Sequence, residues 1–238
     1  MYVLYWQRWR RWLWLAAALA AVAFVGVCGW YWLQERDVPV MEVQPIYRGN
    51  VERKAMALAF NVDWGEEYLP AILQTLSQKQ VRATFFPTGQ WATKFPDLVK
   101  KMAGEGHEIG NHGYGHLHVN DLSREENRRD MQRAEEVLTT LTGRRPVLYA
   151  PPYGENKPQV VAAAGDLGYK FIMWTINPGD YLPGTRPEDI VHAVVSYSQN
   201  GAIVLLHPTA PTVEALPEVI NRLQKLGYTL ATVSEILG

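Results

Sequence analysis

A regular alternation of short apolar runs with segments of helical spacing, from residue 55 to the C-terminus, limits most strongly how this chain folds. The strand-like runs are residues 56–62, 82–89, 107–112, 147–154, 169–176 and 202–207. The segments of helical spacing between them are residues 66–80, 96–106, 123–143, 156–168, 186–201 and 212–227. Strands that alternate with helices favour a parallel sheet, so we predict an α/β fold that closes into a barrel-like shape. The region, about 185 residues long, is short for a full eight-fold barrel.

The residues with catalytic or ligand chemistry fall where the predicted strands end. In folds built from parallel strands, the carboxyl ends of the strands meet at one edge, and that edge carries the chemistry. The positions that follow the strands are Asn61, Asp63, His112, His116, the segments 151–154 and 177–180, and His207. This coincidence predicts that they belong to one site.

Three of the six histidines of the chain lie in one stretch, GNHGYGHLHVND. His112 and His116 are four residues apart, and on a helical turn that spacing puts two imidazoles on one face, where they can bind one ion. A catalytic divalent metal usually takes a third protein ligand and an open position for water, and Asp63 is the best-placed carboxylate. The alternative is a pair of surface histidines in a polar loop. His107 and His118 are better explained as structural or exposed side chains.

The N-terminus carries an uncharged run over residues 12–33, preceded by Arg8, Arg10 and Arg11. This run of 22 residues is long enough to cross a bilayer as a helix, and tryptophans stand at both of its ends. The excess of arginine before the run predicts a cytoplasmic N-terminus and an extracytoplasmic remainder. A cleaved signal peptide is the alternative. Its apolar region is usually shorter and ends in small residues, whereas this run ends in Trp-Tyr-Trp-Leu.

These features divide the chain into four parts: a cytoplasmic N-terminus over 1–11, a transmembrane anchor over 12–33, a linker over 34–54 and a folded domain over 55–238. We therefore expect a single-pass protein of the cell membrane, with the lipid bilayer as one partner. The formal net charge of −1 gives no indication of nucleic-acid binding. The only cysteine, Cys28, lies in the predicted anchor, so the folded domain has no disulfide.

Six stretches of the domain match known motifs in their order and spacing: AFNVDWG, ATFFPTG, HEIGNHGYGH, APPYG, WTINPGDY and IVLLH. From about residue 55 to its end, the chain thereby resembles the polysaccharide deacetylases, the carbohydrate esterases with NodB homology. The resemblance implies a deformed (β/α) barrel of the NodB-homology type and a bound divalent metal, most commonly zinc. It also implies hydrolysis of N-acetyl groups from N-acetylglucosamine units of peptidoglycan, chitin or related glycans, so a cell-wall glycan is the expected partner.

The resemblance also assigns roles to individual residues. The metal ligands that it implies are Asp63, His112 and His116. His207 matches the general acid that protonates the leaving amine, and Asp180 matches the aspartate that orients this histidine. The backbone N–H of Tyr153 matches an oxyanion-hole donor, and the substrate pocket is assigned to Pro151, Pro152, Leu205 and Trp174.

The chain departs from the family pattern at the position of the general base. Asn61 stands where the family has an aspartate, and Val62 makes the loop one residue longer. An amide does not take up a proton near neutral pH. Ala150 replaces the arginine that braces this aspartate in the family, so both members of a charged pair are missing together and no buried guanidinium is left unpaired. The fourth motif differs as well, with Asn177 for a common aspartate and Tyr181 for a common tryptophan.

Three functions remain open on these grounds. The first is an active deacetylase in which Asp63, Glu66 or Glu67 replaces the missing base, or in which metal activation and His207 carry the step. The second is a non-catalytic glycan-binding protein, and the third is a hydrolase of a different amide or ester. The retained ligand and acid positions favour a hydrolase. The FNVDWG version of the first motif also resembles variants in membrane-anchored deacetylases of the cell wall and of sporulation, which favours peptidoglycan.

Overall fold

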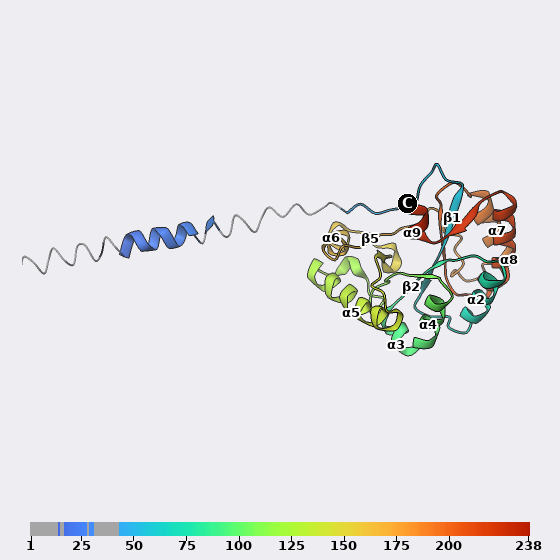
Figure 1. Cartoon of the computed structure of the whole chain (residues 1–238), viewed down its shortest axis with the longest axis horizontal. Helices are drawn as coiled ribbons and strands as arrows, with labels where there is room; N and C mark the ends of the chain where they lie inside the picture. Colours follow the sequence, from blue (N-terminus) through green and yellow to red (C-terminus); the bar gives the residue numbers. More distant parts are fainter. Residues whose placement is uncertain (1–13, 15–16, 28, 31–42) are drawn as a thin grey trace, which may run out of the picture. The chain divides into compact units, whose positions relative to one another are not determined.

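The computed structural model describes Trp14, residues 17–27, 29–30 and 43–238 (Figure 1). The chain divides into two compact units, Met1–Met41 and Glu42–Gly238. The described residues of the first unit are helical and exposed. Among the described helices, none combines the length and the apolar character that a membrane crossing requires. Eight residues of the predicted anchor over 12–33, including both of its ends, lie outside the described residues, so the anchor stays a prediction.

The second unit is built on a parallel sheet whose central strand is β1 (Ala55–Val62). This strand pairs with β2 (Thr84–Pro87) and β6 (Ile203–Leu206), and its first residues also pair with β7 (Thr229–Ala231). On the far side of β2 lies β3 (Glu108–Ile109). All eight residues of β1 are buried, which is typical of a parallel strand that is covered on both faces.

A second, two-stranded sheet completes a ring of strands. It pairs β4 (Leu148–Tyr149) with β5 (Lys170–Phe171), again in parallel. Isolated parallel bridges join the two sheets at both sides, between Asn111 and Tyr149 and between Ile176 and Val204. The pairing therefore runs from β1 through β2, β3, β4 and β5 to β6 and back to β1. The predicted α/β fold with a parallel, barrel-like sheet is confirmed.

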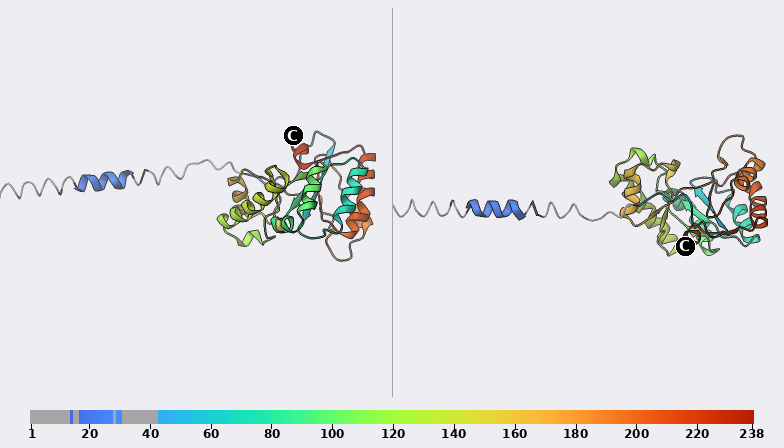
Figure 2. Two further views of the ribbon diagram at one scale, coloured as in Figure 1. Left: turned by 60° about the horizontal axis from the view of Figure 1, so that its bottom comes forward. Right: turned by 90° about the horizontal axis from the view of Figure 1, so that it is seen from above.

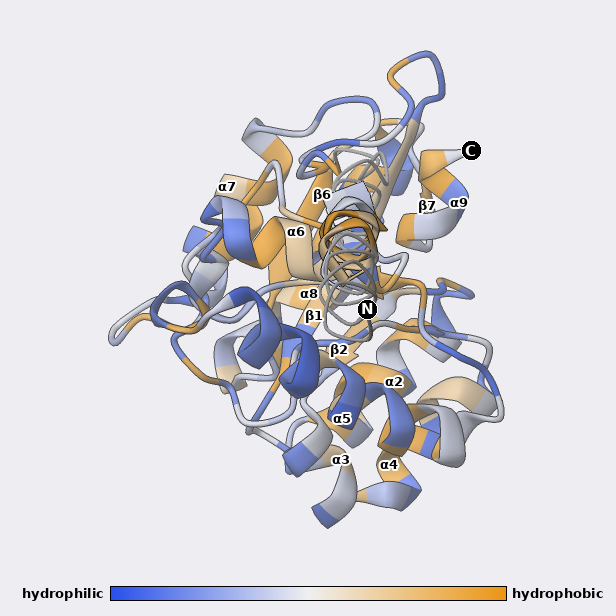
Figure 3. Ribbon diagram, turned by 90° about the vertical axis from the view of Figure 1, so that its left-hand side faces the viewer, coloured by the Kyte–Doolittle hydropathy of each residue, from blue (hydrophilic) through white to orange (hydrophobic). Residues whose placement is uncertain are grey.

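Helices surround this ring, and each predicted helical segment overlaps an observed helix. The helices are α2 (Leu69–Gln78), α3 (Gly89–Lys94), α4 (Pro96–Gly104), α5 (Arg124–Thr142), α6 (Pro158–Asp166), α7 (Pro187–Ser196), α8 (Ala210–Lys225) and α9 (Val233–Leu237), with 3₁₀ turns η1 (Val119–Asp121) and η2 (Pro152–Gly154). Helices α2, α7 and α8 pack together on one flank, and α5 packs on α6 on the other (Figures 1 and 2). Hydropathy follows the same plan, because the strands are largely apolar while α5 is mostly hydrophilic (Figure 3).

The longest helix, α5, begins as its sequence predicts. The side chain of Ser123 accepts a hydrogen bond from the backbone of Glu126, and the side chain of Glu126 accepts one from the backbone of Ser123. This reciprocal capping satisfies two backbone donors at the start of the helix. Gly143 ends it in the left-handed conformation, with a φ of 70°. Helix α5 is thus fixed at both ends, and it lies next to the candidate site described below.

The second half of the predicted linker belongs to the folded unit. Ile46 exchanges backbone hydrogen bonds with the β5 segment, donating to Phe171 and accepting from Met173. Gly49 donates to the carbonyl of Gly201, at 2.8 Å. The prediction of a linker over 34–54 is therefore wrong for residues 43–54, because this stretch forms backbone pairs that a polar, proline-containing sequence does not announce.

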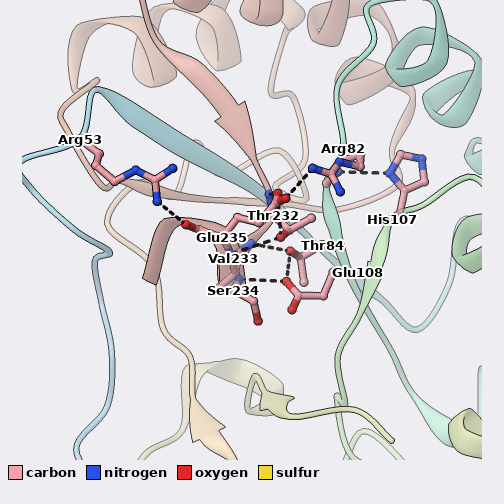
Figure 4. Close-up of polar contacts among 10 residues, drawn as sticks. Arg53, Arg82, Thr84, His107, Glu108, Thr232, Val233, Ser234 and Glu235 are labelled. Atoms are coloured by element: carbon pink, nitrogen blue, oxygen red, sulfur yellow. Dashed lines mark hydrogen bonds and ion pairs between the residues drawn. The ribbon is translucent and has the colours of Figure 1, made fainter. Parts of the chain in front are cut away.

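A polar network fastens the amino ends of the strands to α9 (Figure 4). Thr84 donates its hydroxyl to Glu108 at 2.8 Å, and Glu108 also accepts the backbone N–H of Ser234 at 3.1 Å. Glu235 pairs with Arg82 in the same network. A cavity of about 650 Å³ opens beside it and is lined by none of the predicted site residues. We call this end of the barrel, where the network joins β2 and β3 to α9, the closed end.

His107 belongs to this closed end. Its Nδ1 accepts the backbone N–H of Ala83 at 3.2 Å, and burial lowers its pKa. His118 lies elsewhere, exposed and paired with Glu155 at 2.9 Å. Both histidines have structural partners or lie at the surface, as predicted.

Candidate active site

The carboxyl ends of the strands bring together Asp63 and three histidines. The imidazole rings of His112 and His116 lie 5.1 Å apart between centroids. Burial lowers the pKa of both of these histidines and the neighbouring His207 lowers it further, while the carboxylate of Asp63 acts in the opposite direction on His116. Residues as far apart in the sequence as Asp63 and His116, or His112 and His207, therefore share one electrostatic environment.

His112 has the geometry of a neutral metal ligand. Its ring is 2% exposed, and Nδ1 lies 2.7 Å from the carbonyl oxygen of Ala150. Because a carbonyl only accepts, Nδ1 carries the proton, which leaves the lone pair on Nε2. Burial lowers the pKa of His112 to about 3, with a further contribution from His116. The ring therefore stays neutral at physiological pH, as a metal ligand must.

His116 follows a sharp turn of the loop. Its φ is 51°, a left-handed backbone that is uncommon outside glycine. Burial lowers the pKa of His116, and Asp63 acts in the opposite direction. The ring packs edge-on against Tyr153, with 4.6 Å between centroids. An observed backbone outlier in a cluster of this kind is typical of a functional site.

Asp63 is held from two sides. The hydroxyl of Thr88 donates to its Oδ1 at 2.7 Å, while the Thr88 Oγ1 also caps α3. Two residues on, Gly65 has a φ of 80°, and a Cβ there would lie 2.1 Å from the carbonyl oxygen of Pro208. Only glycine fits at this position. The loop after β1 is therefore pressed against the segment that follows His207.

The donor set fits a divalent cation in its chemistry. It offers two imidazoles and one carboxylate, the kind of set that binds catalytic zinc while leaving a position open. In the described part of the chain, however, no three histidine, cysteine, aspartate or glutamate side chains are already arranged as a metal site. The free Nε2 of His112 is the structural feature that favours a cation here. The roles of Asp63, His112 and His116 as ligands stay a prediction.

His207 and Asp180 form an oriented acid–base pair. Asp180 is 2% exposed, and its Oδ1 accepts from Nδ1 of His207 at 2.9 Å. The second oxygen of Asp180 accepts the backbone N–H of His207 at 2.5 Å and the hydroxyl of Thr212 at 2.7 Å. These bonds fix the ring, and the Nε2 of His207 makes no hydrogen bond to the described residues, so it is available to carry a proton, as a general acid requires.

Aromatic side chains flank this pair. The indole of Trp64 lies parallel to the His207 ring, 6.3 Å away between centroids, and Tyr181 meets it edge-on at 4.9 Å. Trp64, Tyr181 and Tyr153 are 43%, 46% and 57% exposed. Large apolar faces open to solvent around polar groups are typical of a binding surface.

The substituted base position is buried and uncharged. Asn61 is 7% exposed, and its side chain makes no hydrogen bond to any described residue. Ala150 is 3% exposed and packs with Phe86 and Leu148 in an apolar cluster. Its carbonyl oxygen holds His112, so position 150 contributes through its backbone. The region is neutral, as the joint loss of aspartate and arginine predicts.

The other predicted residues lie around this centre. Tyr153 has a φ of 57°, and its backbone N–H makes no hydrogen bond within residues 43–238, so it is free to donate. Pro151, Pro152 and Leu205 are buried, and Trp174 is half-buried, with its ring 2.7 Å from where a Cβ of Gly154 would lie. Nothing here contradicts their assignment to a substrate pocket, which stays a prediction.

The candidate replacement bases differ from one another. Glu66 accepts the indole N–H of Trp91 at 3.4 Å and is half-buried. Glu67 is exposed and makes no side-chain hydrogen bond to the described residues. Glu66 is therefore the better-oriented carboxylate of the two.

The sequence did not reveal the residues that hold the site. They are Thr88, Thr212 and Asp130, which bond to Asp63, to Asp180 and to the backbone of the histidine loop. Thr88 stands inside the motif ATFFPTG, which is the one available signal. The other two lie in helices whose patterns carry no mark of this role.

Comparison with known proteins identifies a family whose members are similar to this chain in sequence and structure. Residues 48–172 match the family described as polysaccharide deacetylase. The uncharacterised protein YlxY of Bacillus subtilis is 36% identical over 197 residues, which are 83% of this chain and 61% of YlxY. The chain thus spans less than two thirds of that relative. A peptidoglycan-N-acetylglucosamine deacetylase of Bacillus cereus is 33% identical over 192 residues, covering 79% of this chain and 70% of the relative.

Two solved structures of one protein are also similar to this chain. BA3943 from Bacillus anthracis, described as a CE4 family pseudoenzyme, superposes with a TM-score of 0.80 and 36% identity, covering 83% of this chain and 70% of that chain. A BA3943 mutant described as having restored enzymatic activity superposes with the same TM-score of 0.80 and 34% identity, covering 83% of this chain and 72% of that chain. The family match extends over more than half of the residues, and the fold agrees over the whole domain. The chain belongs to the polysaccharide deacetylase family.

Proposed function

We propose that the protein is a membrane-anchored, metal-dependent hydrolase that removes N-acetyl groups from N-acetylglucosamine units of a cell-wall glycan, with peptidoglycan as the favoured substrate. The observation that carries this proposal is the intact pair of Asp180 and His207 beside the neutral, buried His112. A protein that had lost its chemistry would have no need of an acid fixed by two hydrogen bonds to a buried carboxylate.

The residues would divide the work as follows. Asp63, His112 and His116 would hold a divalent cation, most commonly zinc in this family. A cation held by these residues would polarise the acetyl carbonyl and would lower the pKa of a water that it binds. The free N–H of Tyr153 donates to the oxygen that becomes negatively charged during attack. His207, oriented by Asp180, gives a proton to the departing amine.

A non-catalytic glycan-binding protein is the second candidate. Asn61 supplies no carboxylate at the base position, and the similar BA3943 is described as a pseudoenzyme. Exposed Trp64, Tyr153 and Tyr181 would serve binding with or without turnover.

One assay separates these candidates. The full-length protein in detergent is incubated with zinc and either peptidoglycan or chitooligosaccharides, and released acetate is measured. The hydrolase releases acetate, and His207→Ala slows the release at least roughly 100-fold. A binder retains glycan and yields no acetate from either substrate. An unchanged rate of release in His207→Ala contradicts the assigned acid.

The replacement base has its own test. Because Glu66 is oriented by Trp91 and Glu67 is not, Glu66→Gln should reduce acetate release roughly 100-fold if a carboxylate of this loop takes the proton. Glu67→Gln serves as the matched control. Equal activity of both variants with the wild type excludes these two carboxylates.

The location at the cell membrane is part of the proposal and rests on the sequence of residues 1–33. Fractionation of cells that produce the full chain should place it with the membranes, and protease added outside spheroplasts should remove the folded unit. Recovery in the soluble fraction contradicts the anchor.

A further inference from the structure

The loop between His112 and His116 is not held by regular secondary structure. Its carbonyl groups at Gly113 and Tyr114 accept from the first amides of α3, at 2.9 Å each. Its N–H groups must find other partners, because a buried donor without an acceptor is costly. The three residues between the histidines therefore depend on side chains from elsewhere.

Two side chains satisfy all three of these amides. Asn111 accepts the N–H of Gly113 through Oδ1, at 2.8 Å. Asp130, on α5, accepts the N–H of Tyr114 through Oδ2 at 2.8 Å and the N–H of Gly115 through Oδ1 at 3.2 Å. Both oxygens of the Asp130 carboxylate thus accept hydrogen bonds from the backbone that separates the two imidazoles.

Helix α5 makes two further contacts with the loop and the residue before it. Arg133, one turn after Asp130 on the same face, places its guanidinium 3.6 Å from the ring centre of Tyr114. The side chain of Asn111 donates to the carbonyl of Met131 on α5 at 2.9 Å. The loop is therefore attached to a helix that is itself capped at both ends.

The fit between Asp130 and the loop leaves no spare room. Gly113 has a φ of 74°, and a Cβ at this position would lie 2.5 Å from Oδ2 of Asp130. A carboxylate fits here only because residue 113 has no side chain.

We propose that Asp130 is a positioning residue of the site, whose carboxylate sets the separation of the His112 and His116 imidazoles by holding the backbone between them. The proposal rests on the proposed function for its consequence, because two ligands must keep a fixed separation to bind one cation. Groups that hold ligands in place typically change metal affinity roughly 10- to 100-fold when they are altered.

The test compares full-length wild type with Asp130→Asn, which keeps the size of the side chain and replaces one acceptor oxygen with a donor. Zinc affinity is measured by competition with a chelator, and melting temperature is measured without metal. We expect a roughly 10- to 100-fold loss of affinity with a melting temperature within a few degrees of the wild type. Glu136→Gln, on the exposed side of the same helix, is the matched control and should change neither value.

A second variant approaches the same contact from the loop. Gly113→Ala pushes a methyl group against Oδ2 of Asp130 and should weaken zinc binding in the same range. Wild-type affinity in both Asp130→Asn and Gly113→Ala would overturn the proposal.

Amide hydrogen exchange without metal separates this proposal from the proposed function. Because asparagine keeps one acceptor oxygen, Asp130→Asn should speed exchange roughly tenfold at whichever of Tyr114 and Gly115 loses its acceptor. The amide of Gly113, which Asn111 holds, should stay near its wild-type rate. If the wild type binds no zinc, the proposed function fails, and this exchange pattern alone decides on Asp130. Unchanged exchange at both amides would refute the positioning role.

Discussion

The two ends of the barrel each carry a polar cluster with a buried histidine, yet the clusters differ in how their groups are used. At the amino ends of the strands, the hydroxyl of Thr84 donates to Glu108 (Figure 4). The carboxylates of Glu108 and Glu235 also accept backbone N–H groups of the segment that begins α9. At the carboxyl ends, which we call the open end, the Nε2 of His112 and the N–H of Tyr153 make no hydrogen bond within the described part of the chain. A cluster that satisfies itself stabilises a fold, whereas a cluster that leaves groups open is prepared for a ligand.

The histidines make the same contrast. His107 uses its Nδ1 to accept from the backbone, and His112 uses its Nδ1 to donate to a carbonyl. The first arrangement anchors a strand, and the second orients a lone pair toward the site. Residue type and burial alone therefore do not distinguish a structural histidine from a candidate ligand, but the direction of its hydrogen bond does.

The largest expected effect comes from removing the acid at the open end. His207→Ala should lower kcat for acetate release by roughly 10² to 10⁴-fold, because general acid catalysis contributes in that range. His107→Ala, at the closed end, should leave kcat per folded molecule unchanged. Steady-state kinetics on both variants decides. Similar losses of kcat in the two variants would contradict the claim that only the open end takes part in catalysis.

Restoring the missing aspartate and arginine at positions 61 and 150 should raise activity at the open end. Asn61→Asp combined with Ala150→Arg supplies a carboxylate base and the cation that braces it, so acetate release should rise roughly 100-fold. The single Ala150→Arg variant should be destabilised, because it places an unpaired cation at a position that is 3% exposed. An inactive, well-folded double variant would show that the rest of the site has lost its function.

The sequence predicts some residues of the candidate site and misses others. The strand-end positions Asp63, His112 and His207 were predicted to meet, because parallel strands end at one edge, and the structure brings them together. Asp130 and Thr212 were missed. Their bonds to the loop and to Asp180 connect positions 16 and 32 residues apart, and no local pattern encodes such pairs.

The fold shows the same limit. Long segments of helical spacing predicted their helices, and the segment 123–143 matches α5 closely. Short elements were less visible. Helix α3 (Gly89–Lys94) was not predicted, and residues 43–54 were assigned to a linker although they pair with the barrel. Backbone pairing of this kind depends on tertiary contacts rather than on side-chain periodicity.

A smaller effect is expected at the closed end. Glu108→Ala removes the acceptor for the hydroxyl of Thr84 and for the N–H of Ser234. The free energy of unfolding should fall by about 1–3 kcal/mol, because the buried donors lose their partner. Denaturant titration measures this change, and kcat serves as the control that should stay constant. A loss of activity without a loss of stability would contradict a purely structural role.

A last expected effect, on stability alone, is a dependence on pH in the metal-free protein. Burial lowers the pKa of His107 and His112 in the folded state, so the unfolded chain takes up protons first as pH falls. Stability is full above pH 6.5, the ordinary value for histidine, and declines as pH falls from there toward about 3 for His112. Each histidine contributes at most about 1.4 kcal/mol per pH unit.

Substitution of either histidine by glutamine should flatten this profile between pH 6 and 4 in chemical denaturation. A profile that keeps its slope in both variants would assign the acid sensitivity to other groups.

Zinc titration of the metal-free, full-length protein tests the central claim most directly. We predict one ion bound per chain, loss of that binding in His112→Ala and wild-type binding in His107→Ala, because only the open end presents its imidazole to a ligand. Absence of zinc binding in the wild type, or binding that survives in His112→Ala, would contradict the account.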